Sequence, residues 1–186
     1  MKKTFTFAAL MAVLSLGGFT RMFADTRVDI ENYNGTRILE IETDPDDDDH
    51  DVVIVREIGD RVWIDIIRFD LDNAPPAFEP GRATGFDGTT DDYVDELRDL
   101  PNKIGYRSET RRLRDFDRVT IDTFGGSDQV YWFQSGPPGG TPATFGRLTV
   151  DTGRGDDYVF GNSNGDYTIC YLGDGDDEAT IWAKRQ

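Results

Sequence analysis

The sequence predicts a mainly β fold, namely a right-handed parallel β-helix or β-roll-like solenoid with an irregular, partly helical insertion. Apolar and polar residues alternate over many short runs, as expected for half-buried strands. A larger unit also recurs: an alternating strand, a turn rich in Gly or Asp, and an Asp that opens a second alternating strand. Such repetition is typical of solenoids, in which each copy covers the apolar face of its neighbour.

The first residues match the pattern of a secretory signal peptide. A basic start at Lys2 and Lys3 is followed by an apolar run that leads to a small residue, Ala24. We therefore expect residues 1–24 to be removed and residues 25–186 to form a single domain that is secreted, periplasmic or held at the cell surface. The run is short and broken by glycines, so no stable membrane span is expected after cleavage. The alternative is a retained N-terminal anchor.

Four segments contain the recurring unit. One lies near the N-terminus and the others follow Asp117, so that residues 117–183 hold the best-formed Gly-Asp repeats. The four segments are residues 39–55, 119–133, 148–160 and 169–182. We expect them to form successive coils of the solenoid.

Residues 70–116 lack the repeat, and we expect them to form the insertion. Residues 89–100 begin with cap-type residues and carry apolar side chains at helical spacing, which predicts a short helix closed by Pro101. A basic cluster follows, consisting of Arg107, Arg111, Arg112, Arg114 and Arg118. These arginines could bind an anionic ligand, but pairing with the surrounding acids as a solvated face is the interpretation we favour.

Charge and cysteine content limit the classes of function. The chain of 186 residues has a formal net charge of −16, and loss of Lys2, Lys3 and Arg21 with the signal peptide would make it −19. A chain this acidic repels nucleic acid and anionic membranes and attracts cations. Cys170 is the only cysteine, so no internal disulfide can hold the exported protein together. The sequence therefore requires another kind of cross-link.

The C-terminal copies follow a nine-residue pattern. Residues 152–160 place Gly at the second and fourth positions, Asp at the sixth and Val at the eighth, and residues 123–131 and 172–180 repeat most of this pattern. Residues 161–169 again carry Asp at the sixth position, Asp166. The N-terminal copy keeps only the later part, with Asp51 sixth and Val53 eighth.

This pattern resembles the hemolysin-type (RTX) calcium-binding nonapeptide and its degenerate versions in exported bacterial proteins. The resemblance covers about 117–183 well, 39–57 weakly and 70–116 not at all. It implies a parallel β-roll in which glycine turns expose backbone carbonyls and the sixth-position Asp binds Ca²⁺ between adjacent coils. The first-position glycine of the family pattern is missing at Thr123, Thr152 and Leu172, which implies few complete calcium cages.

On the matching positions, the resemblance implies calcium sites made by Asp side chains and turn carbonyls. The residues implied are Gly126, Asp128, Gly153, Gly155, Asp156, Asp157, Asp166, Gly173, Gly175, Asp176 and Asp177. Calcium takes six to eight oxygen ligands, and glycine lets a tight turn aim several carbonyls at one point. Stacked carboxylates would repel one another without a cation between them. The competing interpretation is that Asp-Gly turns are ordinary connectors.

Other sites match less well. Residues 44–51 imitate the start of an EF-hand loop, but Asp49 stands where that loop requires Gly and Val55 stands where it requires Glu. His50 is the only histidine, so no arrangement with a second histidine is available, and we interpret it as a solvated neighbour of the acidic run.

We therefore expect an exported calcium-binding repeat protein with a structural or surface-associated role and no catalysis. Its expected partners are calcium ions and an unidentified cell-surface or extracellular partner, but not nucleic acid. Two alternatives stay open. One is a β-helix enzyme acting on acidic polysaccharide, with Arg111, Arg112 and Arg114 as substrate contacts, and the other is a metal-free adhesive solenoid.

Overall fold

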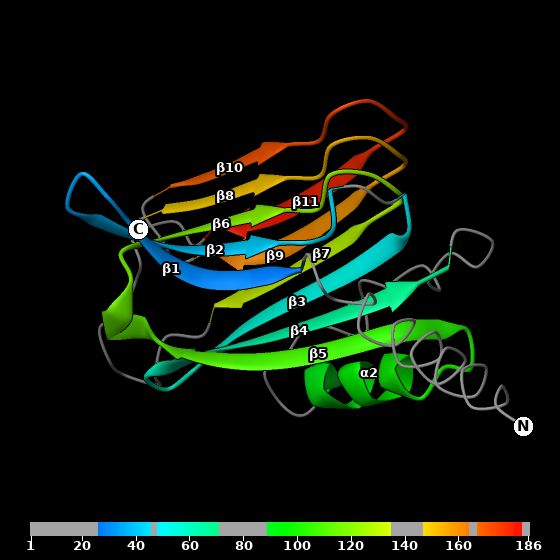
Figure 1. The fold of residues 1–186 in the computed structure, drawn as a ribbon, viewed down its shortest axis with the longest axis horizontal. Helices are drawn as coiled ribbons and strands as arrows, with labels where there is room; N and C mark the ends of the chain where they lie inside the picture. The colour runs from blue at the N-terminus through cyan, green and yellow to red at the C-terminus, as the bar shows by residue number, and fades with distance from the viewer. Residues whose placement is uncertain (1–25, 46–47, 71–88, 135–146, 164–166, 184–186) are drawn as a thin grey trace, which may run out of the picture.

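The computed structural model describes residues 26–45, 48–70, 89–134, 147–163 and 167–183. These residues form two mixed β-sheets that pack together around a common core, with one short helix outside them (Figure 1). One sheet has five strands in the order β1-β2-β6-β8-β10. The other has six strands in the order β11-β9-β7-β3-β4-β5.

The bounds of the elements are as follows. The five-stranded sheet contains β1 (Arg27–Tyr33), β2 (Thr36–Glu42), β6 (Arg118–Asp122), β8 (Arg147–Asp151) and β10 (Thr168–Tyr171). The six-stranded sheet contains β3 (His50–Ile58), β4 (Arg61–Phe69), β5 (Lys103–Arg112), β7 (Gln129–Gln134), β9 (Tyr158–Ser163) and β11 (Glu178–Ala183). The helix is α2 (Thr89–Arg98), and a short 3-10 turn, η1 (Leu113–Asp115), follows β5.

The predicted solenoid is wrong, because the chain forms two separate mixed sheets. Tight hairpins are the reason: β1 pairs antiparallel with β2, and β3 pairs antiparallel with β4, which pairs antiparallel with β5. The first hairpin turns at Asn34 and Gly35, both with positive φ, and the second turns at Gly59, also with positive φ. A hairpin returns the chain to the sheet that it has just left, so it cannot continue a solenoid coil.

The four repeat copies nevertheless lie side by side with parallel strands. Their first strands form β2-β6-β8-β10, and their second strands form β3-β7-β9-β11. Equivalent residues are in register: Ile41 is opposite Ile121, which is opposite Val150, which is opposite Cys170. The turns that join the two sheets therefore lie one above another, at the right of Figure 1.

The main core lies between the two sheets. Inward-facing aliphatic residues of both sheets, together with Trp132, form one buried cluster. A second cluster lies on the outer face of the six-stranded sheet, where Tyr93, Val94 and Leu97 of α2 pack against residues such as Ile67 and Tyr131. The predicted helix is thus present, and its apolar spacing is explained by this contact.

The segment 70–116 is not an irregular insertion in the part that is described. Residues 103–112 form β5, an edge strand hydrogen-bonded to β4 over nearly its whole length. Sequence reasoning missed β5 because it contains few apolar residues and many charged ones, which hides the alternation expected of a strand.

The predicted signal peptide, residues 1–24, lies outside the described residues. Among the described residues, no helix is long and apolar enough to cross a membrane.

Candidate functional site

Three of the turns that join the sheets carry the predicted Gly-Asp residues. They connect β6 to β7, β8 to β9 and β10 to β11, and their backbones are hydrogen-bonded to one another. The Arg154 N–H donates to the Phe124 carbonyl over 3.0 Å, and the Asp174 N–H donates to the Gly153 carbonyl over the same distance. The turns therefore continue the ladder that pairs the strands.

The glycines in these turns are required by close contact between neighbouring turns. A Cβ atom on Gly155 would lie 1.7 Å from the carbonyl oxygen of Gly126, and one on Gly173 would lie 1.6 Å from that of Gly153. Both glycines also have positive φ, a conformation that other residues adopt only with strain. Gly126, Gly153 and Gly175 show the same combination of a close carbonyl and positive φ.

The sixth-position aspartates form a column across adjacent strands. The N–H of Asp51 donates to Asp128 Oδ1 over 2.8 Å, that of Asp128 donates to Asp157 Oδ1 over 2.8 Å, and that of Asp157 donates to Asp177 Oδ1 over 3.0 Å. We call these four residues the aspartate column. The carboxylates of Asp128, Asp157 and Asp177 thus accept a hydrogen bond from the backbone of the preceding copy, which fixes the register of the turns. The carboxylate of Asp51 instead pairs with Arg68.

The residues one position earlier form a second, outer column that runs in the opposite sense. The Ser127 N–H donates to His50 Nδ1 over 2.7 Å, the Asp156 N–H donates to Ser127 Oγ over 3.3 Å, and the Asp176 N–H donates to Asp156 Oδ1 over 3.0 Å. The interpretation of His50 as solvated is therefore wrong. Its side chain is buried and accepts a backbone hydrogen bond at Nδ1.

Threonines precede the same turns and link them from the inner side. The hydroxyl of Thr43 donates to the carbonyl of Thr123 over 2.9 Å, and that of Thr152 donates to the carbonyl of Leu172 over 3.1 Å. A longer contact of 3.4 Å joins the Thr123 hydroxyl to the Thr152 carbonyl. Each of these threonines directly follows the acid that ends the first strand of its copy. The role of the threonines could not be predicted from the sequence, because it depends on which copies become neighbours.

The two middle carboxylates of the aspartate column are buried. Asp128 is fully buried and Asp157 nearly so, and the Oδ2 atom of each has no hydrogen-bond partner. Burial, together with the charge of Asp51, holds the pKa of Asp128 well above its ordinary value, although the hydrogen bond from Asp51 opposes this rise. Burial, with Asp177 and Asp156 as like charges, raises the pKa of Asp157 to about 6.

These carboxylates suit two kinds of partner, a proton or a cation. A buried carboxylate oxygen without a donor is unfavourable unless it is neutralised. Calcium accepts carboxylate and carbonyl oxygens, and a carbonyl that already accepts one N–H bond keeps a second lone pair. Within the described residues, however, no group of three or more Asp, Glu, His or Cys side chains is arranged to hold a metal ion. A calcium ion here would therefore take most of its ligands from backbone carbonyls and water.

The structure brings together most of the residues predicted for the site. Asp128, Asp157 and Asp177 lie in the aspartate column, and Asp156 and Asp176 lie in the outer column. The predicted glycines lie between them in the turns. Asp166 is outside the described residues. Asp51, His50 and Ser127 also belong to these columns and were not predicted as site residues, although the nine-residue alignment already placed Asp51 at the sixth position.

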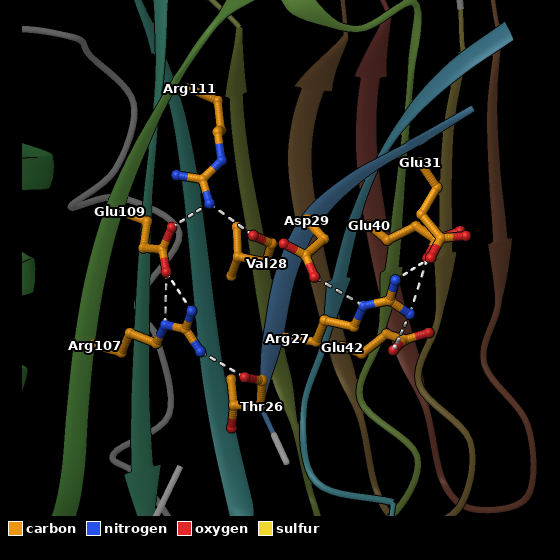
Figure 2. Close-up of polar contacts among 10 residues, drawn as sticks. All are labelled: Thr26, Arg27, Val28, Asp29, Glu31, Glu40, Glu42, Arg107, Glu109 and Arg111. Atoms are coloured by element: carbon orange, nitrogen blue, oxygen red, sulfur yellow. Dashed lines mark hydrogen bonds and ion pairs between the residues drawn. The ribbon is translucent and has the colours of Figure 1, made fainter. Parts of the chain in front are cut away.

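Two arginines of the basic cluster link the edge strands at one end of the strand array. Arg107 and Arg111, on β5, both pair with Glu109, and they donate to the backbone carbonyls of Thr26 and Val28 beside them (Figure 2). We call this set of contacts the arginine seam. It joins β5 to β1, the edge strands of the two sheets. Figure 2 also shows Arg27 of β1 among four acids: Asp29, Glu31, Glu40 and Glu42.

Comparisons with models of protein families, with curated proteins and with solved structures gave no match to this chain.

Proposed function

We propose that this is an exported calcium-binding protein with a structural or surface-associated role, and that calcium binds at the stacked Gly-Asp turns. The observation that carries the proposal is the pair of buried carboxylate oxygens, Oδ2 of Asp128 and Oδ2 of Asp157, which have no hydrogen-bond partner. The resemblance of the turns to the hemolysin-type nonapeptide supports the same conclusion, as does the signal-peptide pattern for export.

Calcium would relieve an electrostatic conflict within the aspartate column. The Asp51 carboxylate is paired with Arg68, but those of Asp128, Asp157 and Asp177 lie one copy apart, just before β7, β9 and β11. Neighbouring strands are about 4.8 Å apart. At that separation like charges repel strongly where water is excluded. A divalent cation changes this repulsion into a cross-link between copies. A site with few carboxylate ligands is also expected to bind weakly, in the range of about 10⁻⁴–10⁻³ M that is typical of extracellular calcium modules.

The enzyme alternative loses one of its expected substrate contacts. Arg111 is held by Glu109 and by the Val28 carbonyl in the arginine seam, so it does not face solvent as a free cation. Arg112 and Arg114 are exposed. The remaining pair gives no specific support for recognition of an acidic polysaccharide.

Calorimetric titration tests the site. Replacement of Asp157 by asparagine should weaken calcium binding by about tenfold or more, because affinity depends on the number of charged ligands. The asparagine side chain still has an oxygen that can accept the hydrogen bond from the Asp128 N–H. The substitution therefore removes the charge while preserving the link between the turns.

The matched control is Asp60→Asn, which removes a carboxylate from an exposed hairpin turn outside the aspartate column. We expect this variant to bind calcium like the unaltered protein. Equal binding by the Asp157→Asn and Asp60→Asn variants would place the calcium site elsewhere, and absence of binding by the unaltered protein would refute the proposed function.

A further inference from the structure

The two ends of the strand array are built differently. At one end, the arginine seam joins the edge strands β1 and β5. At the other end, β10 and β11 are the edge strands of the two sheets, and no described strand lies beyond them. We call the pair β10 and β11 the open end. Figure 1 shows these two strands at the same outer border of the two layers.

At the open end, the residues that the structure describes cover the apolar core only in part. In the preceding copy Val150 and Val159 are 1% exposed, whereas their partners in the open end are Cys170, which is half-buried, and Ala179, which is exposed. Tyr171 is 53% exposed. The β10 sequence, Thr-Ile-Cys-Tyr, contains neither proline nor charge, the features that usually protect an edge strand from pairing.

We propose that the open end binds the open end of a second copy of this chain, so that both sheets continue across a two-fold interface. A partner that covers the open end must present two strand edges at the separation of β10 and β11. A second copy meets this condition because it carries the same two strand edges at the same separation, and an isologous interface uses the same surface of both copies. Edge pairing would also bury the apolar residues that the last copy exposes.

Charge selects between the two ways in which the copies could pair. The turn between β10 and β11 is acidic and exposed, with Asp174 and Asp176, and the exposed Glu178 follows it at the start of β11. If the two-fold axis ran along the strands, β10 would pair with β11 of the other copy and the acidic turns would face each other. If the axis is perpendicular to the two sheets, β10 pairs with β10 and β11 pairs with β11. Each acidic turn then lies beside the opposite end of the partner's strands.

A described cation, Arg147, lies close to that opposite end. The Arg147 guanidinium lies over the ring of Tyr167, just before β10, at 5.4 Å from the ring centroid. The arrangement with the axis perpendicular to the sheets therefore brings each acidic turn toward Arg147 of the other copy, and it is the one that we propose.

Sedimentation analysis of the purified protein tests the interface. We expect a dimer whose dissociation constant rises by more than about tenfold in Ala179→Lys, because a lysine on β11 places a charge where the sheets should join. Tyr33→Lys adds the same charge at the tip of the β1–β2 hairpin, where Tyr33 is 70% exposed, and should leave the dimer unchanged. A monomer at all concentrations, an open-ended assembly, or equal dimers in both variants would overturn the proposal.

Oxidative cross-linking gives a second test that does not depend on the folding of a variant. Cys170 is the only cysteine, so a covalent dimer of the unaltered protein must join Cys170 to Cys170. Because β10 has only four residues, antiparallel pairing centred on this strand would place the two Cys170 residues directly or diagonally opposite each other, where we expect them to form a disulfide. We expect mild oxidation to give a covalent dimer that is absent in Cys170→Ser. A non-covalent dimer that resists this cross-link would refute the pairing of β10 with β10.

Discussion

Replacement of Gly155 by alanine should lower the free energy of unfolding by more than about 4 kcal/mol, a loss seen only when a specific structural requirement is broken. The new Cβ would lie 1.7 Å from the Gly126 carbonyl oxygen, which belongs to backbone and cannot move aside without separating the turns. Neighbouring turns would lose their hydrogen bonds together with the strain-free conformation of Gly155 itself. Urea unfolding of the purified protein measures the loss.

Gly59→Ala is the matched control. Gly59 also has positive φ, but a Cβ there would meet nothing within 4 Å, so only the backbone strain of about 1–2 kcal/mol is expected. The difference between the two variants isolates the contact between turns. Similar losses in both variants would show that the turns of adjacent copies do not lie in direct contact.

Lowering the pH from about 7.5 to about 5 should stabilise the calcium-free protein, opposite to the trend expected of a protein held by ionised carboxylates. The pKa of Asp157 is raised to about 6, and burial, with Asp151 and Glu42 as neighbours on the same sheet, raises the pKa of Asp122 to about 6 as well. A folded state with a raised pKa binds protons more tightly than the unfolded chain. The stability that protonation contributes is therefore complete below about pH 4 and is lost as the pH rises through about 6.

For Asp157, the rise from the ordinary value of 3.8 to about 6 sets an upper limit of roughly 3 kcal/mol on the stability that the calcium-free protein loses between about pH 4 and neutral pH, because solvent screening reduces the effect. Asp157→Asn should therefore flatten the pH dependence measured by urea unfolding in chelator. The control is Asp117→Asn, because Arg37 lowers the pKa of Asp117 to about 2 and places its titration below this pH range. A calcium-free protein that loses stability on acidification to about pH 5 would contradict the burial of ionisable carboxylates in the aspartate column.

The repeats allowed the sequence to predict part of the fold. Alternation and the recurrent Gly-Asp turn correctly indicated a mainly β protein. The copies lie parallel to one another because equivalent residues of successive copies form the same strands and the same turn. The solenoid was wrong because the hairpins at Asn34-Gly35 and at Gly59 were overlooked, although Asn-Gly is a strong hairpin signal. The family resemblance extended the solenoid prediction to the N-terminal half of the chain. There, however, the residues of the hairpin turns determine the topology.

The site was predictable in its positions but not in its contacts. The nine-residue pattern located Asp128, Asp157 and Asp177 in equivalent turns. It could not reveal that each carboxylate accepts a hydrogen bond from the neighbouring backbone, since that contact depends on the register of the sheets. His50 was misinterpreted for the same reason: its acidic sequence neighbours suggest solvent, whereas its place in the outer column is set by the pairing of β3 with β7.

Thermal unfolding in calcium and in chelator decides whether calcium holds the stacked turns together. A ligand that binds only the folded state stabilises it by RT ln(1 + [L]/Kd), which is about 2.7 kcal/mol at one hundred times Kd. At about pH 7.5, above the raised pKa of Asp157, we expect calcium to raise the melting temperature and chelator to reverse the rise. Magnesium should stabilise less, because it requires a tighter octahedral arrangement of ligands. A melting temperature that is the same in calcium, magnesium and chelator would contradict the account and leave the aspartate column as a purely structural hydrogen-bond ladder.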